Sequence, residues 1–332
     1  MELMRAAVLE RPCAPLRLTR VPVPEPGPGE ILLRLEASGV CHTDVHVWKG
    51  EVVPPVAPDP FILGHEGIGR VVAVGPDGGA WAVGDRAGAA WQHDACGICD
   101  ECRSGQESFC QVHRAHGFNV PGTFAEYVIA KADFVVRIPE GPAAELAPLM
   151  CAGLTAYGAL DRAALREGET CAIFGCGGLG LYAVQLAARR GARVLAVDAD
   201  PAKLALAQNL GASEIRLAGD ALPSGCAHVT VNFAPTARTW PGMTAVTRPM
   251  GRIVAAAMVS EPVALNQEWL TASGITLSGA SVGTRAQMRA LMALHQTRPL
   301  AAEILPIALD DVTDALAALA DGRAKGRYCI RF

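Results

Sequence analysis

The pattern of apolar and polar positions changes near residue 150, which predicts two domains of different kinds. Before that point, short extended runs such as residues 31–40 (ILLRLEASGV) and 67–75 (GIGRVVAVG) are interrupted often by Gly and Pro. Such interruption is typical of an irregular, mostly β domain. From residue 170 onward, short apolar runs alternate with helical periodicity, and this alternation predicts a parallel, doubly wound sheet.

The second half opens with a strand–turn–helix–strand unit. Residues 170–175 (TCAIFG) predict a strand, 179–191 a helix that stops at glycine, and 192–198 (ARVLAVD) a second strand. A helix is also expected at 201–211, because proline stands in its first turn and glycine at its end. Further parallel strands are predicted at 228–233, 251–258 and 274–280.

Composition and charge narrow the class of protein. The 332 residues suffice for two domains with real cores, and a net charge of −4 leaves no electrostatic footprint for nucleic acid. The N-terminus lacks the apolar stretch of a signal peptide, and no apolar run reaches the length of a membrane helix. We therefore expect a cytoplasmic protein with no membrane partner, whose eleven cysteines are reduced and available for metal binding or catalysis.

A glycine-rich turn lies between the first strand and helix of the second half. Gly175, Gly177 and Gly180 form a G-x-G-x-x-G pattern, which permits a tight turn, close approach of a pyrophosphate, and close packing of helix on strand. The next strand ends in Asp198, whose carboxylate can accept hydrogen bonds from ribose hydroxyls and would repel a 2′-phosphate. The unit therefore predicts a dinucleotide site that prefers NAD to NADP.

Two groups of residues are candidate metal ligands. Cys41, His65 and Cys151 would leave a tetrahedral zinc ion with one open position, which is the arrangement of a catalytic site, and Glu66 is adjacent. The second group is the four-cysteine segment 96–110 (CGICDECRSGQESFC). By ligand count alone it could form disulfides, hold an iron–sulfur cluster, or bind a structural zinc ion, including that of a stand-alone zinc ribbon.

These motifs together resemble the zinc-dependent alcohol dehydrogenases of the medium-chain dehydrogenase/reductase superfamily, in the bacterial and yeast-like branch. C-H-T-D-x-H, G-H-E-x-x-G, the four-cysteine loop, C-A-G-x-T and G-x-G-G-x-G occur in family order from about residue 5 to the C-terminus. The resemblance implies a GroES-like irregular β catalytic domain at 1–152 with a structural zinc lobe at about 92–113, a Rossmann domain with a doubly wound parallel sheet at 153–285, and a return to the catalytic domain at 286–332.

The resemblance also implies roles for individual residues. Cys41, His65 and Cys151 would hold the catalytic zinc ion, with Glu66 able to reach the metal, Asp44 holding His65, and Thr43 and His46 passing the proton through the nicotinamide ribose to solvent. Cys96, Cys99, Cys102 and Cys110 would hold the structural zinc ion. The cofactor would contact His42, Thr155, Gly175, Gly177, Gly178, Leu179, Gly180, Asp198, Lys203, Ser281, Val282 and Arg327.

The implied activity is reversible hydride transfer between NAD and an alcohol, with two Zn²⁺ per chain. Trp48 and Trp91 stand where the branch narrows its substrate pocket, which favours primary alcohols over bulky secondary ones and leaves aromatic alcohols open. A homotetramer or homodimer is expected. Two alternatives remain: a zinc-independent enal or quinone-type reductase of the same superfamily, and a non-catalytic NAD-binding redox sensor.

Some features depart from the branch. Asn232 stands where an acidic residue is expected, and Pro241 interrupts the helical periodicity of residues 236–251. The segment 214–250 is also short. These positions belong to the adenine side and the oligomer-forming half of the cofactor domain, so they bear on the quaternary structure rather than on the chemistry.

Overall fold

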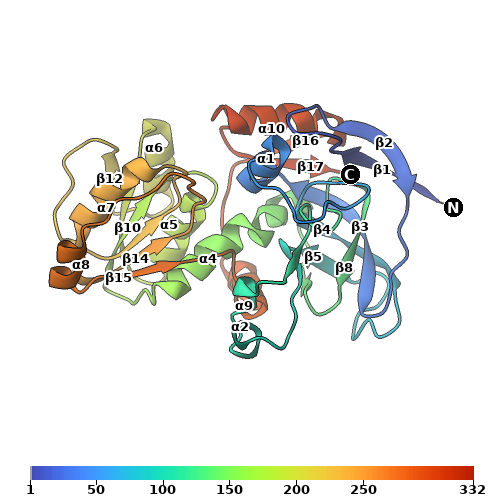
Figure 1. The fold of residues 1–332 in the computed structure, drawn as a ribbon, viewed down its shortest axis with the longest axis horizontal. Coiled ribbons are helices and arrows are strands. Elements are labelled where there is room, and N and C mark those ends of the chain that lie inside the picture. The colour runs from blue at the N-terminus through green and yellow to red at the C-terminus, as the bar shows by residue number, and fades with distance from the viewer. Residues whose placement is uncertain (1) are drawn as a thin grey trace. The chain divides into compact units, whose positions relative to one another are not determined.

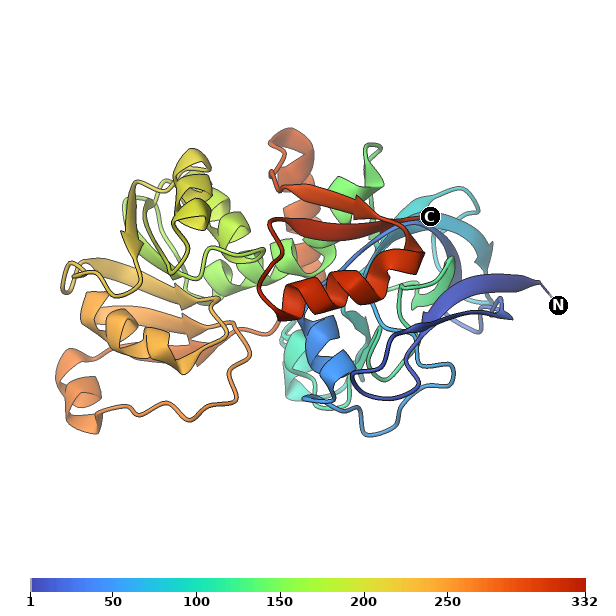
Figure 2. The ribbon, with the colours of Figure 1, turned by 90° about the horizontal axis from the view of Figure 1, so that it is seen from above.

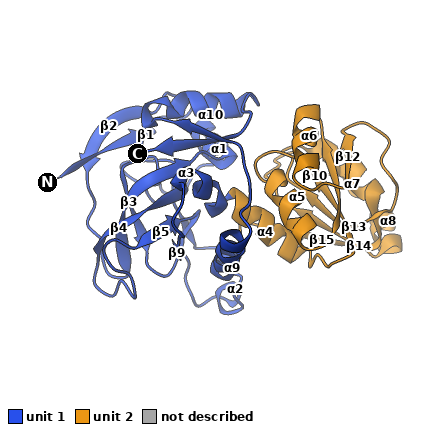
Figure 3. Ribbon diagram, turned by 180° about the vertical axis from the view of Figure 1, so that it is seen from behind, with its two compact units in different colours: residues 1–151, 284–332 blue, residues 152–283 orange. Residues whose placement is uncertain are grey.

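The computed structural model describes residues 2–332. The chain divides into two compact units, which Figure 3 shows in different colours. Unit 1 comprises Met1–Cys151 and Thr284–Phe332, and unit 2 comprises Ala152–Gly283. The C-terminal segment belongs to the same unit as the N-terminal half.

Unit 1 is built mainly of antiparallel strands. Its largest sheet has seven strands in the order β16-β17-β3-β4-β5-β9, with β8 also paired to β3. The strands of this unit are β1 (Leu3–Val8), β2 (Arg17–Pro22), β3 (Glu30–Gly39), β4 (Glu66–Val74), β5 (Arg86–Ala89), β6 (Gln92–Asp94), β7 (Arg114–Ala115), β8 (Tyr127–Lys131), β9 (Val136–Arg137), β16 (Ile304–Ile307) and β17 (Arg327–Arg331). The pairing of β3 with β4 shifts register twice, so the irregular β domain predicted from the interrupted apolar runs is confirmed.

The helical segments of unit 1 range from single turns to the 13 residues of α9. They are α1 (His42–Lys49), α2 (Asp100–Arg103), η1 (Glu107–Phe109), α3 (Ala143–Leu146), η2 (Ala147–Met150), α9 (Arg285–Thr297), η4 (Leu309–Asp311) and α10 (Val312–Ala320). Helices α1 and α10 lie side by side in both views (Figures 1 and 2). They share one buried cluster through Val45 and Val47 on α1 and Val312 and Leu316 on α10. The C-terminal segment therefore braces the helix that carries the C-H-T-D-x-H motif.

Unit 2 contains a six-stranded parallel sheet in the order β12-β11-β10-β13-β14-β15. Its strands are β10 (Thr170–Phe174), β11 (Arg193–Asp198), β12 (Glu214–Leu217), β13 (Ala227–Asn232), β14 (Thr247–Ala255) and β15 (Thr276–Gly279), and its helices are α4 (Ala152–Arg162), α5 (Gly180–Arg189), α6 (Pro201–Asn209), η3 (Ala237–Thr239), α7 (Trp240–Val246) and α8 (Gln267–Ser273). This is the strand order of the dinucleotide-binding doubly wound fold. The predicted Rossmann architecture is confirmed.

Two short elements of unit 2 give weak sequence patterns. Pro241, which interrupts the helical periodicity of its segment, lies where the 3-10 turn η3 gives way to α7, in the first turn of that helix, where a missing N–H costs nothing. Strand β12 was not predicted, since its four residues at the edge of the sheet are only half-buried and give no apolar run. An element of four to seven residues is too short to show a clear period of apolar positions in the sequence.

Within residues 2–332, no single helix is long and apolar enough to cross a membrane, and only the bent helix pair Ala143–Met150 and Ala152–Arg162 passes a test of length and composition when taken together.

Candidate metal centres and cofactor loop

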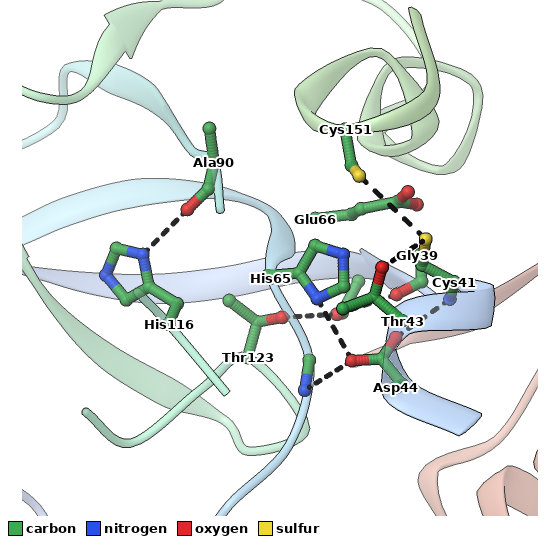
Figure 4. A network of polar contacts seen from close by, with 12 residues as sticks. Gly39, Cys41, Thr43, Asp44, His65, Glu66, Ala90, His116, Thr123 and Cys151 are labelled. Atoms are coloured by element: carbon green, nitrogen blue, oxygen red, sulfur yellow. Dashed lines mark hydrogen bonds and ion pairs between the residues drawn. The ribbon is translucent and has the colours of Figure 1, made fainter. Parts of the chain in front are cut away.

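Four metal-ligating side chains from three separate segments meet inside unit 1. Cys41 precedes α1, His65 and Glu66 stand at the start of β4, and Cys151 follows η2. One ligand atom of each lies within 4.8 Å of all the others, and all four residues are buried. The Sγ atoms of Cys41 and Cys151 are 3.8 Å apart, and Figure 4 shows the side chains converging. The three ligands predicted for a catalytic metal are therefore brought together, with Glu66 beside them.

A single carboxylate organises this buried cluster. Oδ2 of Asp44 accepts from the backbone N–H of Cys41 at 2.8 Å, and Oδ1 accepts from the N–H of Gly64 at 3.1 Å. Oδ1 also lies 3.0 Å from Nδ1 of His65. A carboxylate at this position can only accept, so the ring proton of His65 is on Nδ1 and the lone pair is on Nε2.

The opposite ring nitrogen supplies a test of whether the cluster suits a metal. Nε2 of His65 is buried and has no hydrogen-bond partner among the described residues. A buried nitrogen without a partner costs free energy, unless something that binds a lone pair completes it. Two sulfurs and one imidazole nitrogen are a donor set that zinc prefers, and they leave a fourth position open. The residues therefore fit a catalytic type of zinc site.

The charges around the buried cluster favour a thiolate at Cys41. The hydrogen bond with Cys151, together with His65, lowers the pKa of Cys41 well below its usual value, although burial opposes this. Burial also disfavours a charged His65, yet the charge and hydrogen bond of Asp44 raise the pKa of this ring well above its usual range. The charges thus favour negative sulfur at Cys41, and because a metal-bound histidine is neutral, a divalent cation would replace the second ring proton that the raised pKa of His65 favours.

Glu66 and Arg327 form a buried ion pair next to the cluster. Both carboxylate oxygens of Glu66 lie 2.5 Å from Nη2 of Arg327. Burial raises the pKa of Glu66 to about 7, against the opposing charge of Arg327. A Cβ on Gly39 would lie 1.9 Å from Oε2 of Glu66, so only glycine leaves room for this carboxylate. Arg327, predicted to contact the cofactor, is thus engaged with Glu66 in this structure.

Helix α1 carries the residues predicted to move a proton. Oγ1 of Thr43 lies 3.9 Å from Sγ of Cys41. His46 is three residues after Thr43 and four residues after His42, so its side chain is a neighbour of each of them on the helix surface. The rings of His42 and His46 are 5.0 Å apart between centroids. Thr43 therefore lies next to the buried cluster, and the role of His46 in a relay stays a prediction.

Glu51 is a residue of this face that the sequence analysis missed. Its Oε2 lies 2.5 Å from Nδ1 of His46. An acidic residue directly after the glycine that ends a helix, and five positions after a histidine, was the available signal. It carries little weight in a sequence alone, because the direction of a side chain beyond a helix end depends on the cap geometry.

The two tryptophans predicted to line the substrate pocket occupy different surroundings. Trp91 meets the ring of His65 edge-on, with centroids 5.1 Å apart, and adjoins Phe118. Trp48 packs against the apolar cluster shared by α1 and α10, and its indole N–H donates to the carbonyl of Ala14 at 2.7 Å. Trp91 therefore borders the metal cluster, whereas a pocket role for Trp48 stays a prediction.

The four-cysteine segment forms a second cluster of possible metal ligands. The sulfurs of Cys96, Cys99, Cys102 and Cys110 lie within 4.8 Å of one another, and all four thiols are free. Sγ of Cys96 accepts from the N–H of Cys99 at 3.4 Å, and Sγ of Cys99 accepts from that of Cys102 at 3.5 Å. Backbone donors to sulfur lower the pKa of Cys96 to about 6. Four sulfurs would complete a tetrahedron, as in a structural zinc site.

The glycine loop of unit 2 has the geometry that its pattern predicts. Gly175 has φ +89°, and a Cβ there would lie 2.6 Å from the backbone of Ala234. A Cβ on Gly180 would lie 1.8 Å from the carbonyl of Gly175, whereas a Cβ on Gly177 would meet nothing within 4 Å. Two glycines therefore close the turn, and the third keeps space open in front of it.

Asp198 lies at the end of β11 and holds the same loop. Its Oδ2 accepts from the N–H of Cys176 at 2.6 Å, and its Oδ1 accepts from that of Asp200 at 2.9 Å. The other residues predicted to contact the cofactor are divided between the units. Thr155, Gly178, Leu179, Lys203, Ser281 and Val282 belong to unit 2, and His42 and Arg327 belong to unit 1.

Comparison with known proteins gives consistent matches over both units. Residues 27–140 match the family described as alcohol dehydrogenase GroES-like domain, and residues 178–297 match the family described as zinc-binding dehydrogenase. The alcohol dehydrogenase of Rhizobium meliloti (strain 1021) is 37% identical over 339 residues, covering 98% of each chain. A thermostable alcohol dehydrogenase from Pyrobaculum aerophilum superimposes with a TM-score of 0.92 at 29% identity over 100% of both chains. Acetophenone reductase from Geotrichum candidum, solved with NAD, gives 0.90 at 29% identity over 100% of this chain and 98% of its own.

The variant Asp44→Asn should weaken metal binding at the buried cluster by about 10- to 100-fold, because His65 loses the acceptor that fixes its proton on Nδ1. The measurement is zinc retention against a chelator. Asp94→Asn, which removes a carboxylate paired with Arg114 outside this cluster, is the control and should retain the metal. Equal retention by both variants would contradict this account of Asp44.

The variant Cys99→Ser should lose about one zinc ion per chain and lower Tm by about 5 °C or more, because the four-cysteine lobe lacks a ligand to close its tetrahedron. Zinc content and thermal unfolding are measured on the same sample. Cys226→Ser is the control, since Cys226 belongs to neither ligand cluster. Unchanged zinc content in Cys99→Ser would exclude a metal at this lobe.

Proposed function

The chain belongs to the zinc-dependent alcohol dehydrogenases of the medium-chain dehydrogenase/reductase superfamily, and from that premise we propose that it uses NAD to interconvert primary alcohols and aldehydes. The observation that carries the proposal is the buried cluster of Cys41, His65 and Cys151, in which one histidine nitrogen has no protein partner. A zinc-independent reductase would have no use for this donor set.

Three residues would hold the catalytic zinc ion. They are Cys41, His65 and Cys151, and Asp44 keeps the imidazole turned toward the two sulfurs. When bound there, zinc acts as a Lewis acid on the oxygen of an alcohol or a carbonyl. Glu66 stands beside these ligands, but its pairing with Arg327 makes it a neighbour of the site and not a fourth ligand in this structure.

Thr43 and His46 would carry the proton released by alcohol oxidation. The hydroxyl of Thr43 stands next to Cys41 and can both accept and donate a hydrogen bond. His46 follows on the same face of α1 and is less buried than the metal ligands, so it can exchange a proton with water. Trp91 walls the site at His65 and would limit the bulk of the substrate.

The glycine loop and Asp198 support NAD as the cofactor. The open space in front of Gly177 and the positive end of the dipole of helix α5 suit a pyrophosphate. The carboxylate of Asp198 at the end of β11 would accept from ribose hydroxyls and repel a 2′-phosphate. A homodimer or homotetramer belongs to the same proposal, and β15 is an edge strand of the sheet with an unpaired side.

The proposal predicts NAD reduction with ethanol, hexanol or benzyl alcohol, slower turnover of 2-propanol, and about two zinc ions per chain. NADP should support at most about a tenth of the NAD rate, because Asp198 repels the extra phosphate. Initial rates and zinc content are measured on one preparation. Cys151→Ser should abolish turnover and Cys226→Ser should not. Full zinc without turnover of any alcohol would overturn the proposed reaction.

The two glycines Gly180 and Gly177 should respond differently to alanine. Gly180→Ala should lower the unfolding free energy by about 1–3 kcal/mol, because its Cβ would collide with the carbonyl of Gly175. Gly177→Ala should leave Tm unchanged and weaken NADH binding by about tenfold or more, because its Cβ enters the space expected for the pyrophosphate. Thermal unfolding and NADH fluorescence titration measure the two effects, and the reverse pattern would contradict the assignment.

A further inference from the structure

The carboxylate of Glu51 lies next to the proposed proton path, and the proposed reaction assigns it no function. Glu51 follows helix α1, and its Oε2 lies 2.5 Å from Nδ1 of His46. Its Oε1 is 3.9 Å from Nζ of Lys49, which is a much longer ion pair. The side chain of His46 is 18% exposed and that of Glu51 is 48% exposed. The contact therefore joins a half-buried imidazole to a carboxylate at the surface of unit 1.

The backbone directs Glu51 onto His46. Helix α1 ends at Gly50, whose φ of +72° is in the left-handed region. The chain then reverses, and the N–H of Glu51 donates to the carbonyl of His46 at 2.9 Å. The two residues are thus joined by a main-chain hydrogen bond as well as by their side chains. The carboxylate is held beside the ring by the helix cap and does not rely on side-chain attraction alone.

The contact determines which ring nitrogen carries the proton. The hydrogen bond to His46 lowers the pKa of Glu51, so this carboxylate is ionised near neutral pH and can only accept. Nδ1 of His46 is therefore the protonated nitrogen of the neutral ring. Nε2 has no hydrogen-bond partner among residues 2–332, and its lone pair is available.

The other charged groups near His46 do not accept a hydrogen bond from its ring. Its ring faces His42 on the same helix, and Lys49 is one turn further along. Helix α10 packs against α1, but among the described residues its charged residue Asp314 forms no hydrogen bond or ion pair with His46. Glu51 is accordingly the acceptor that orients this ring.

We propose that Glu51 is a positioning residue for proton release: it keeps the proton of His46 on Nδ1, so that Nε2 accepts the proton leaving the site and passes it to water. The inference rests on the proposed dehydrogenase function. In each turnover Nε2 gains one proton, the imidazolium keeps its Nδ1–H hydrogen bond to Glu51, and Nε2 then loses one proton to water. The carboxylate itself stays ionised throughout.

The first test measures the ring and does not depend on activity. Nitrogen-15 NMR of the histidine rings in the zinc-loaded, NAD-free protein should show His46 protonated at Nδ1 and unprotonated at Nε2. Glu51→Ala should shift His46 toward the Nε2-protonated form, whereas Glu10→Ala should not. Glu10 is a matched control, because it also forms a side-chain ion pair on unit 1, but with Arg17 and not with His46. A wild-type ring protonated at Nε2 would overturn the proposal.

The second test measures the reaction. Single-turnover NAD reduction by benzyl alcohol should slow by about tenfold in Glu51→Ala, with a KM change of less than about twofold, and added imidazole should restore part of the rate. Glu51→Asp should retain more activity than Glu51→Ala. If His46→Gln is slow while Glu51→Ala matches Glu10→Ala, the relay stands and this inference fails. If the wild type oxidises no alcohol, the proposed function fails, and the NMR result alone decides whether Glu51 orients His46.

Discussion

The buried carboxylate of Asp44 is the interaction on which the rest of the metal site depends. A carboxylate that is 1% exposed is costly unless hydrogen bonds replace its water, and Asp44 accepts from the backbone of Cys41 and Gly64 and from the ring of His65. These donors come from two segments on either side of the loop that joins α1 to β4. Satisfying one charge therefore fixes both the first turn of α1 and the direction in which His65 presents its free nitrogen.

The two cysteine-containing clusters differ in burial and in how far apart their ligands lie in the sequence, and these differences suit different roles. In the buried cluster, sequence-distant segments converge on side chains that are shielded from solvent, and Trp91 packs edge-on against the ring of His65. In the four-cysteine lobe, all ligands come from one short, half-exposed loop whose backbone N–H groups point at the sulfurs. The first arrangement suits chemistry on a bound oxygen, and the second suits the stabilisation of a loop that is too short to have a core of its own.

The edge of α1 shows how a helix terminus can extend a catalytic site. The N-terminal end places Cys41 and Thr43 beside the metal cluster, and the C-terminal cap at Gly50 brings Glu51 back to His46. Helix α10 from the C-terminal segment supplies the apolar support behind α1. A short helix of eight residues is thus held at both ends and along one face, which keeps its polar face in a constant orientation.

The sequence by itself determined the features that depend on neighbours along the chain. The glycine loop, the parallel strands after residue 170 and the clustering of Cys96, Cys99, Cys102 and Cys110 follow from local backbone geometry and short spacing. Residue types made Cys41 and Cys151 candidate ligands of one metal and the family resemblance supported this, but spacing says nothing about contacts between residues 110 positions apart, which the tertiary structure brings together. Only the tertiary structure shows that Trp91 contacts His65 whereas Trp48 packs in the apolar cluster of α1 and α10. It alone also shows that Arg327 pairs with Glu66 and that Glu51 contacts His46. The physical reason is that the direction of a side chain at an element's end is decided by caps and by packing against residues far away in the sequence.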